Sequence, residues 1–445
     1  MPTARSVAHE LLERVFFDGA FSHIVLSNAL DDSSLDPRDQ GLVTELVYGT
    51  LARKRTIDTI LDQYVNRALH GLDQPVLVSL RIAAYQLVFL DRIPAHAAVD
   101  EAVGLVKRRC GRGAAGFTNG VLRTMLRKKD DWPVWHQFHP GDQPVQHLGL
   151  RHSLPDWIAQ RLIDDHGFDK AMRIGAAFNE RPPFYLRVLD DPPAPIVAEL
   201  TGVDAVPGVW RTDALDESIH NALEGGRLII QDLGSQLVSH FSAPAAASRI
   251  LDACAGLGGK TMHLGYLAGA DATIVAVEPN RSKLDRLEQT AQSTSFGDRI
   301  HTFHGPIEQL GDDTDHLEKF DLVLVDAPCT GLGVIRRHPE TRWRRSPDDV
   351  ADRAKLQTKL LEHAASYVAE GGTLVYSVCS FVEEEGPEQI EEFLKVQPRF
   401  TRQPPPKNTG VDFSQFTDDA GQLRTNPADH DADAFFAARL IHSET

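Results

Sequence analysis

The sequence predicts an all-helical N-terminal domain followed by a doubly wound α/β domain with a mostly parallel sheet. Apolar residues recur at spacings of three and four from about Arg5 to Lys129, which is the period of amphipathic helices. From Arg249 onward, short apolar runs alternate with helical patterns, as they do where crossover helices join parallel strands. The length of 445 residues agrees with two or three domains, because a single core seldom grows so large.

These patterns divide the chain into four stretches. Residues 1–130 are expected to form the helical domain, with six or seven helices, and residues 131–149 a polar linker. Residues 150–240 form a smaller α+β region that opens with a helix and continues with the strand-like Phe184–Val188. Residues 241–445 form the α/β domain.

The α/β domain has a recognisable series of strands. The expected strands are Ile250–Asp252, Thr273–Glu278, Ile300–Phe303, Leu322–Asp326 and Thr373–Ser377, with a last one over Ala434–Leu440. Parallel strands bring their carboxyl ends to one edge of the sheet, and ligands bind at that edge in open α/β sheets. We therefore look for the functional site among the residues that follow these strands.

Composition and charge exclude several classes of protein. No apolar run can span a bilayer and the N-terminus lacks the apolar core of a secretion signal, so we expect a cytoplasmic protein. The four cysteines form no C-x-x-C pair, which argues against a disulfide scaffold and against a metal site. The net charge is −17, of which residues 1–140 carry +1 and the remainder −18. Attraction to phosphate must therefore come from local patches.

A glycine-rich turn follows the first strand of the α/β domain. It reads Cys254-Ala255-Gly256-Leu257-Gly258-Gly259-Lys260, and a helix follows. Such a turn lets a ligand approach the backbone and points helix N–H groups at it. Glu278, at the end of the second strand and 20 residues beyond Gly258, can accept hydrogen bonds from a ribose. The turn has neither the dinucleotide nor the P-loop spacing, so S-adenosylmethionine fits better than NAD or ATP.

Two cysteines follow two later strands. Cys329 lies in Asp326-Ala327-Pro328-Cys329, and Cys379 lies in Tyr376-Ser377-Val378-Cys379-Ser380. Methylation of cytosine at C5 needs a thiolate that adds to C6, because C5 is otherwise not nucleophilic. The N3 side of the base must also be neutralised or hydrogen-bonded, which suits a carboxyl group such as Asp326. The sequence thus offers two thiols and an acid where this chemistry needs them.

These two motifs closely resemble the Sun (Fmu, RsmB) family of RNA 5-methylcytosine methyltransferases. The resemblance implies a Rossmann-like class I methyltransferase domain, with Cys379 as the nucleophile and Cys329 promoting product release. Glu45–Thr50, Leu80–Leu87 and Thr118–Arg123 are in turn similar to the antitermination factor NusB. That combination implies a bacterial enzyme that methylates small-subunit (16S) ribosomal RNA, and we expect it to act as a monomer.

Two basic patches are the candidate RNA contacts. One consists of Lys107, Arg108 and Arg109 in the helical domain, and the other of Arg336, Arg337, His338, Arg342 and Arg344. Charge runs are more often solvated faces than binding sites, but the second patch lies close to Cys329 in sequence and contains Trp343, which can stack on a base. The target cytosine is expected in a loop or flipped out, because a helix hides C5 and C6.

Alternatives remain open at this point. The same chemistry can serve transfer RNA or large-subunit (23S) RNA, and a methyltransferase fold can be retained in a non-catalytic ribosome-assembly factor. Lys260 either contacts the target base or pairs with Asp326.

Overall fold

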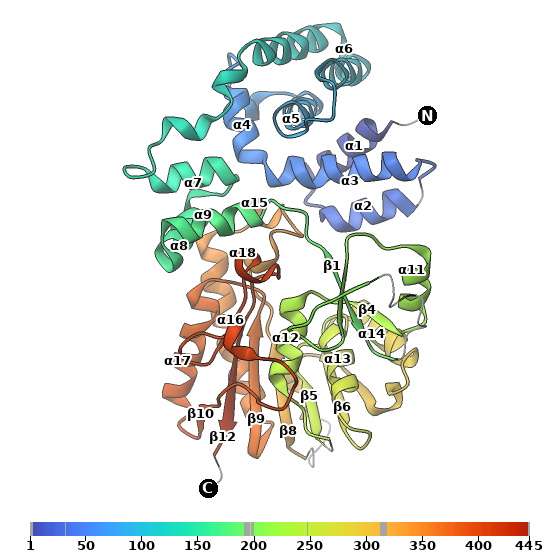
Figure 1. Cartoon of the computed structure of the whole chain (residues 1–445), viewed down its shortest axis with the longest axis vertical. Coiled ribbons are helices and arrows are strands. Elements are labelled where there is room, and N and C mark those ends of the chain that lie inside the picture. The colour runs from blue at the N-terminus through green and yellow to red at the C-terminus, as the bar shows by residue number, and fades with distance from the viewer. Residues whose placement is uncertain are drawn as a thin grey trace. The chain divides into compact units, whose positions relative to one another are not determined.

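The computed structural model describes residues 3–31, 33–190, 196, 200–246, 248–311 and 318–443. They form two compact units, each of which takes two stretches of the chain (Figure 1). The first unit contains Met1–Arg181 and Ile335–Arg344, and the second contains Pro182–Val334 and Arg345–Thr445. The chain therefore returns to the first unit for one short segment, which we call the inserted segment (Ile335–Arg344).

The first unit is helical, as predicted. Its helices are α1 (Ala4–Phe17), α2 (Ser22–Asp31), α3 (Pro37–Ala52), α4 (Lys54–Asp62), α5 (Gln74–Phe89), α6 (Ala95–Arg127), α7 (Pro144–His152), α8 (Asp156–His166), α9 (Phe168–Ala177) and, from the inserted segment, α15 (Thr341–Arg344). Gly111, with φ of 88°, breaks α6 into two runs. No helix within the described residues is both long and apolar enough to cross a membrane.

The helices form because each carries an apolar stripe and a defined start. In α1 the Thr3 hydroxyl accepts from the Ser6 N–H and the Ser6 hydroxyl interacts with Thr3, which is a capping box. The stripe of α1 includes Ala8 and Leu12, both fully buried in one core with apolar side chains of α3 to α6. Packing of these stripes, more than helix propensity, stabilises the unit.

The helical unit extends beyond residue 130. The Arg55 guanidinium forms an ion pair with Asp156 at 2.6 Å, and the Thr56 hydroxyl donates to the Leu150 carbonyl at 2.5 Å. Residues 131–149, expected to be a linker, contain the 3₁₀ turn η3 (Val134–Gln137) and the start of α7. Helices α7 to α9 thus join α4 rather than the small sheet that follows them.

The second unit opens with a small antiparallel sheet. Its strand order is β2-β3-β1-β4. The strands are β1 (Phe184–Val188), β2 (Thr201–Gly202), β3 (Val209–Thr212) and β4 (Leu228–Ile230), with α11 (Glu217–Glu224) before the last. The strand expected over Phe184–Val188 is its central member.

The main sheet follows the order β10-β12-β9-β8-β5-β6-β7, with β11 paired to β12. Its strands are β5 (Arg249–Asp252), β6 (Thr273–Glu278), β7 (Ile300–His304), β8 (Phe320–Asp326), β9 (Val368–Val378), β10 (Phe400–Arg402), β11 (Leu423–Arg424) and β12 (Phe436–His442). Strands β5 to β9 pair in parallel, whereas β10, β11 and β12 pair antiparallel. The predicted doubly wound, Rossmann-like sheet is confirmed.

Helices cover both faces of this sheet (Figure 1). Helices α16 (Pro347–Ala365) and α17 (Pro387–Val396) contribute to one apolar core, and α12 (Leu233–Ser242) and α13 (Gly259–Leu267) contribute to another. The strands between them are buried on both sides, which is why they read as continuous apolar runs. The carboxyl edge of β5, β6, β8 and β9 is left for the residues that follow the strands.

Candidate active site

The two cysteines that follow β8 and β9 lie together. These strands pair in parallel with Asp326 opposite Ser377, so the turns after them reach the same edge. The Sγ atoms of Cys329 and Cys379 are 3.3 Å apart, and both thiols are free. The hydrogen bond with Cys379, followed by burial, raises the pKa of Cys329 well above its usual range. Cys329 is therefore held as a thiol beside Cys379.

Asp326, the last residue of β8, pairs with Lys260 of α13. The Lys260 ammonium contacts Asp326 at 2.6 Å, and the Ser377 hydroxyl donates to the other Asp326 oxygen at 2.7 Å. The Lys260 ammonium also lies 4.9 Å from the centre of the Phe435 ring. Of the two roles left open for Lys260, pairing with Asp326 is the one observed. The pair places the Lys260 cation of α13 against a carboxylate that precedes Cys329 by three residues.

A fully buried carboxylate, Glu385, connects the two cysteine turns. It accepts hydrogen bonds from the Thr330 N–H at 2.8 Å, from the Ser380 hydroxyl at 2.6 Å and from the Gln357 amide at 3.1 Å. The Thr330 hydroxyl also donates to it. The sequence analysis did not select Glu385, because it is one of three consecutive glutamates and nothing local distinguishes the buried one.

Close packing behind Cys379 requires a glycine. The Gly333 N–H donates to the Cys379 carbonyl at 3.0 Å, and the Gly333 carbonyl accepts from the Ala434 N–H at 3.0 Å. A β-carbon at position 333 would lie 1.9 Å from the Ala434 oxygen. Only glycine allows the backbone after Cys329 to lie this close to the backbone of Cys379.

The glycine-rich turn lies between β5 and α13, as expected. Gly256 and Gly258 have φ of 59° and 85°, which L side chains rarely adopt. A β-carbon on Gly258 would also lie 2.6 Å from Leu287 of α14 (Arg281–Gln292). Burial raises the pKa of the Cys254 thiol above its usual range, so this cysteine belongs to the turn's packing. Residues 254–260 thus present backbone at the start of a helix.

Two carboxylates flank this turn. Asp252 ends β5, is fully buried and accepts from the Thr261 hydroxyl at 2.7 Å; burial raises its pKa to about 6. Glu278 ends β6 and is oriented by the Asn280 N–H, which donates to it at 2.8 Å. An open glycine backbone beside a strand-end carboxylate can hold a nucleoside cofactor.

The inserted segment does not present its arginines to solvent as expected. Arg342 is fully buried, and its guanidinium donates to the carbonyl oxygens of Ala52 at 3.3 Å and Phe178 at 3.1 Å. It also donates to the Asn179 side chain at 3.1 Å, and burial lowers the pKa of Arg342 to about 9. A side chain enclosed in this way cannot reach phosphate, which corrects its expected role as an RNA contact.

Other residues of the inserted segment also donate hydrogen bonds to main-chain carbonyls of the helical unit. Arg344 donates to the carbonyl of Val15, in the last turn of α1, at 2.9 Å and to the carbonyl of Ala20, just after the helix, at 2.6 Å. The Trp343 indole donates to a carbonyl of α3, and Arg336 is buried and donates to the carbonyls of residues 180 and 181. The inserted segment is therefore part of the first unit's interior.

The other predicted RNA contacts differ in exposure. Lys107, Arg108 and Arg109 are all exposed on α6, and Arg109 also forms an ion pair with Glu13 at 2.6 Å. Arg337 and His338 are half-buried. The three cations of α6 are thus exposed, and Lys107 and Arg108 are the candidates outside the ion pair with Glu13.

Two histidines and a glutamate form a cluster whose side chains are of the kinds that bind metal ions. Ligand atoms of His23, His338 and Glu340 all lie within 4.8 Å of one another. Both Glu340 oxygens already accept from Ser22, from its N–H at 2.9 Å and its hydroxyl at 2.8 Å, where α2 begins. A helix N-terminus repels cations, so the geometry fits a helix cap better than a metal centre.

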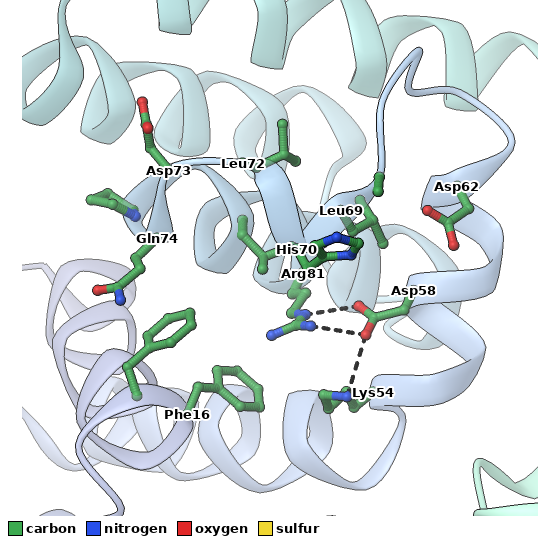
Figure 2. A pocket seen from close by; sticks show the side chains of 14 residues that line it. Phe16, Lys54, Asp58, Asp62, Leu69, His70, Leu72, Asp73, Gln74 and Arg81 are labelled. Atoms are coloured by element: carbon green, nitrogen blue, oxygen red, sulfur yellow. Dashed lines mark hydrogen bonds and ion pairs between the residues drawn. The ribbon is translucent and has the colours of Figure 1, made fainter.

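A pocket of about 900 Å³ in the first unit is the second candidate site (Figure 2). Arg81 donates to both oxygens of Asp58, at 2.7 and 2.9 Å, and Lys54 lies 3.5 Å from the same carboxylate. The Arg81 guanidinium also lies 4.6 Å from the centre of the Phe16 ring. The charged groups of this pocket are therefore paired with one another, and Arg81 also packs against Phe16. The two adjacent thiols remain the better candidate site.

Known proteins resemble this chain over most of its length. The model described as 16S rRNA methyltransferase RsmB/F matches residues 240–441, and the NusB family model matches residues 2–127. Two proteins named probable ribosomal RNA small subunit methyltransferase B are similar. The one from Bacillus subtilis is 32% identical over 408 residues, 89% of each chain. The one from Synechocystis sp. is 31% identical over 452 residues, 99% of each chain.

Solved structures agree on the fold. The crystal structure of PH0851 matches with a TM-score of 0.80 and 23% identity, covering 99% of this chain and 98% of that one. A methyltransferase homologue from Pyrococcus horikoshii matches with a TM-score of 0.57 and 23% identity, over 67% of this chain and 99% of that one. At such identities the likeness supports the architecture alone.

Proposed function

Since this chain belongs to the family of 16S rRNA methyltransferases described as RsmB/F, we propose that it methylates C5 of a cytosine in 16S ribosomal RNA. The single observation that carries the chemical part of this proposal is the 3.3 Å separation of the Cys329 and Cys379 sulfurs at the ends of β8 and β9. Two thiols in contact suit a reaction in which one attacks the base and the other assists its release.

The reaction needs an attack, a transfer and an elimination. The Cys379 thiolate forms a bond to C6, and the C5–C6 electron pair then makes C5 nucleophilic. After C5 has gained the methyl group, its proton passes to water, the C–H electron pair re-forms the C5–C6 double bond, and the C6–S bond breaks to release the Cys379 thiolate. Cys329 assists this release from its place beside Cys379. Asp326 and Lys260 lie together where they can hydrogen-bond and neutralise the N3 side of the base.

S-adenosylmethionine is the proposed cofactor and, when bound, supplies an electrophilic methyl group. The backbone of residues 254–260 and the carboxylate of Glu278 would hold it, beside Asp326. Two features support the fit. Gly258 leaves no room for a side chain, and Glu278 is oriented at the end of the strand next to the turn.

Ribosomal RNA is the proposed partner, bound through exposed features of the helical unit. Lys107 and Arg108 supply accessible charge on α6. Phe21 is 53% exposed, and the Arg344 guanidinium lies 5.2 Å from its ring centre. An exposed ring beside a cation can stack on an unpaired base. Phe21 therefore takes the stacking role that the sequence analysis gave to Trp343.

The test uses methyl-labelled S-adenosylmethionine and unmodified 16S rRNA. Wild type should produce 5-methylcytosine at one site, Cys379→Ala should produce none, and Cys329→Ala should accumulate a covalent protein–RNA adduct on a denaturing gel. Cys110→Ala, in the helical unit, is the matched control and should behave like wild type. Methyl transfer by Cys379→Ala at the wild-type rate would refute the assigned nucleophile.

Two other outcomes separate the alternatives. Methylation of transfer RNA or 23S rRNA, with none of 16S rRNA, would keep the chemistry and change the substrate. Absence of both methyl transfer and cofactor binding, with a Cys379→Ala protein that rescues a deletion strain, would favour a ribosome-assembly factor.

A further inference from the structure

We propose that Glu385 is a positioning residue that fixes the two cysteine turns relative to each other and uses its negative charge to reserve Cys379 for the attack. This inference rests on the proposed cytosine-C5 activity and concerns the division of labour between the two thiols. It involves only residues of the second unit.

The geometry makes Glu385 the common anchor of both turns. One oxygen accepts from the Thr330 N–H and the Gln357 amide, and the other accepts from the hydroxyls of Thr330 and Ser380. Thr330 directly follows Cys329, and Ser380 directly follows Cys379. A single carboxylate thus holds the residue next to each thiol. The Glu385 carbonyl in turn accepts from the Tyr376 hydroxyl at 2.6 Å, which ties the anchor to β9.

Hydrogen bonding alone does not require a charge at this position. A glutamine amide can accept at the oxygen that faces the Thr330 N–H and donate to the two hydroxyls, because hydroxyls both donate and accept. Among the described residues no lysine or arginine lies within ion-pair distance of Glu385, which is fully buried. A carboxylate without a cationic partner is costly to bury, so its charge calls for a separate explanation.

The negative charge of Glu385 also acts on the Cys329 thiol. The pKa of Cys329 is raised by its hydrogen bond to Cys379, by burial and by the Coulomb effects of Cys379 and Glu385. A thiolate attacks, whereas a thiol does not. A negative charge beside Cys329 opposes a second negative charge there, so Cys329 stays protonated while Cys379 reacts. Glu385 thereby prevents two adjacent thiols from competing for the same carbon.

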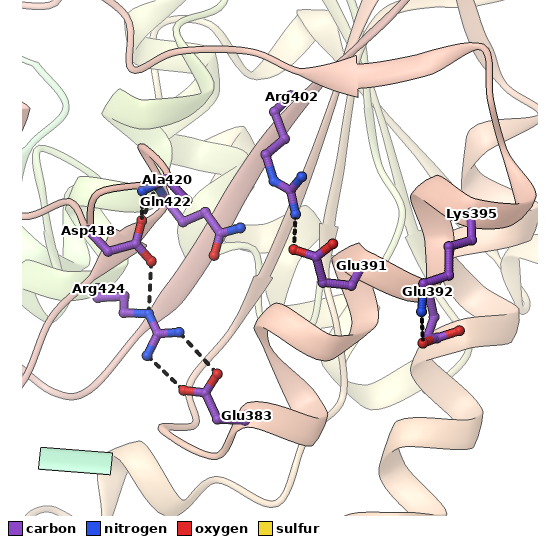
Figure 3. Close-up of polar contacts among 9 residues, drawn as sticks. All are labelled: Glu383, Glu391, Glu392, Lys395, Arg402, Asp418, Ala420, Gln422 and Arg424. Carbon is purple, nitrogen blue, oxygen red and sulfur yellow. Dashed lines mark hydrogen bonds and ion pairs between the residues drawn. The ribbon is translucent and has the colours of Figure 1, made fainter.

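Three variants separate position from charge. Glu385→Gln keeps the hydrogen-bond pattern and removes the charge, and Glu385→Ala removes both. Glu383→Gln is the matched control, two residues away, where the carboxylate faces the Arg424 guanidinium at 2.8 Å (Figure 3). The first readout is the pH dependence of iodoacetamide alkylation at Cys329 and Cys379, resolved by peptide mass spectrometry without RNA. The second readout is kcat and KM for methyl transfer to 16S rRNA.

Glu385→Gln should shift the alkylation profile of Cys329 to lower pH and leave KM within about threefold of wild type, whereas Glu383→Gln should change neither. Glu385→Ala should lower kcat by roughly a hundredfold or more at similar KM, as expected when reacting groups are displaced. An unchanged Cys329 profile in Glu385→Gln overturns the role of the charge. A kcat within threefold of wild type in Glu385→Ala overturns the role of position.

The two proposals can fail separately. If wild type transfers no methyl group to any RNA, the proposed function fails, and the alkylation profiles still decide whether Glu385 controls Cys329. If Glu385→Ala does not fold, the Glu385→Gln alkylation profile still decides the role of the charge, because that variant retains the hydrogen-bond anchor. A loss of kcat in Glu385→Gln as large as in Glu385→Ala, without a shift in the Cys329 profile, also contradicts the proposal.

Discussion

The stretches on either side of residue 335 are adjacent in the chain and are held in opposite ways. Residues 326–334 stay at the edge of the main sheet, where strand register and the Glu385 anchor bring Cys329 to Cys379. Residues 335–344 join the helical unit, where Arg342 is enclosed by main-chain carbonyls. The first stretch carries a thiol, Cys329, beside a second thiol at the sheet edge. The second stretch buries a guanidinium, Arg342, whose hydrogen bonds hold segments of the helical unit together. Reactive or charged residues that are close in sequence can therefore have different roles, one in the candidate active site and the other in folding.

The largest effect that can break this comparison is expected from Arg342→Leu. The substitution leaves carbonyls of Ala52 and Phe178 without a donor, and unpaired buried acceptors cost about 1–3 kcal/mol each. We expect the free energy of unfolding of the first unit to fall by about 3 kcal/mol, measured by urea unfolding. An unchanged urea midpoint combined with weaker RNA binding would instead support the role of Arg342 as an RNA contact.

The pH dependence of the unfolding free energy tests the buried state of Asp252, at the end of β5 in the second unit. Asp252 has a folded pKa of about 6, above its unfolded value, so its protonated form is favoured by folding. Its contribution to stability is fully present below pH 4 and is lost as the pH rises through 6, by up to about 3 kcal/mol. Asp252→Asn should lack this loss. The stability difference between variant and wild type, measured by urea unfolding at pH 4.5, 5.5 and 7, should grow with pH; a constant difference would contradict the assignment.

Two adjacent glycines give a matched pair in the glycine-rich turn after β5. Gly258 has φ of 85° and lies against Leu287, whereas Gly259 has no atom within 4 Å of an added β-carbon. Gly258→Ala should lower the stability by about 2 kcal/mol through strain and overlap. Gly259→Ala should change it by less than about 0.5 kcal/mol, since the residue is helical. Equal melting temperatures for the two variants would show that the turn is not held as described.

The smallest expected effect concerns exposed charge. Arg108→Ala, on the surface of α6, should weaken binding to 16S rRNA by a few fold and reduce the slope of log affinity against log salt by about 1. Lys395→Ala is the control from the second unit, where Lys395 pairs with Glu392 on an exposed helix face (Figure 3). An equal loss of affinity in both variants would mean that α6 has no special role in binding.

Sequence reasoning succeeded where the backbone decides the position of a residue. The alternation of apolar strands placed Asp326, Cys329 and Cys379 at one sheet edge, and the structure has them there. It failed for Arg342, because a basic run has the same local sequence whether its side chains face solvent or main-chain carbonyls of distant segments, such as those of Ala52 and Phe178. It also passed over Glu385, whose burial depends on α16 and on both cysteine turns. Long-range contacts of single side chains leave no local pattern.

The inserted segment also sets the order in which the protein can be completed during synthesis. The helical unit's first stretch ends at Arg181, and Ile335–Arg344 follows after about 150 more residues. At roughly 5–20 residues per second, the ribosome adds them over roughly 8 to 30 seconds. Throughout that interval the nascent helices lack the Arg342 guanidinium, which donates to the carbonyls of Ala52 and Phe178 in the finished unit. The N-terminal domain, although made first, is therefore finished only after four of the eight strands of the main sheet have been translated.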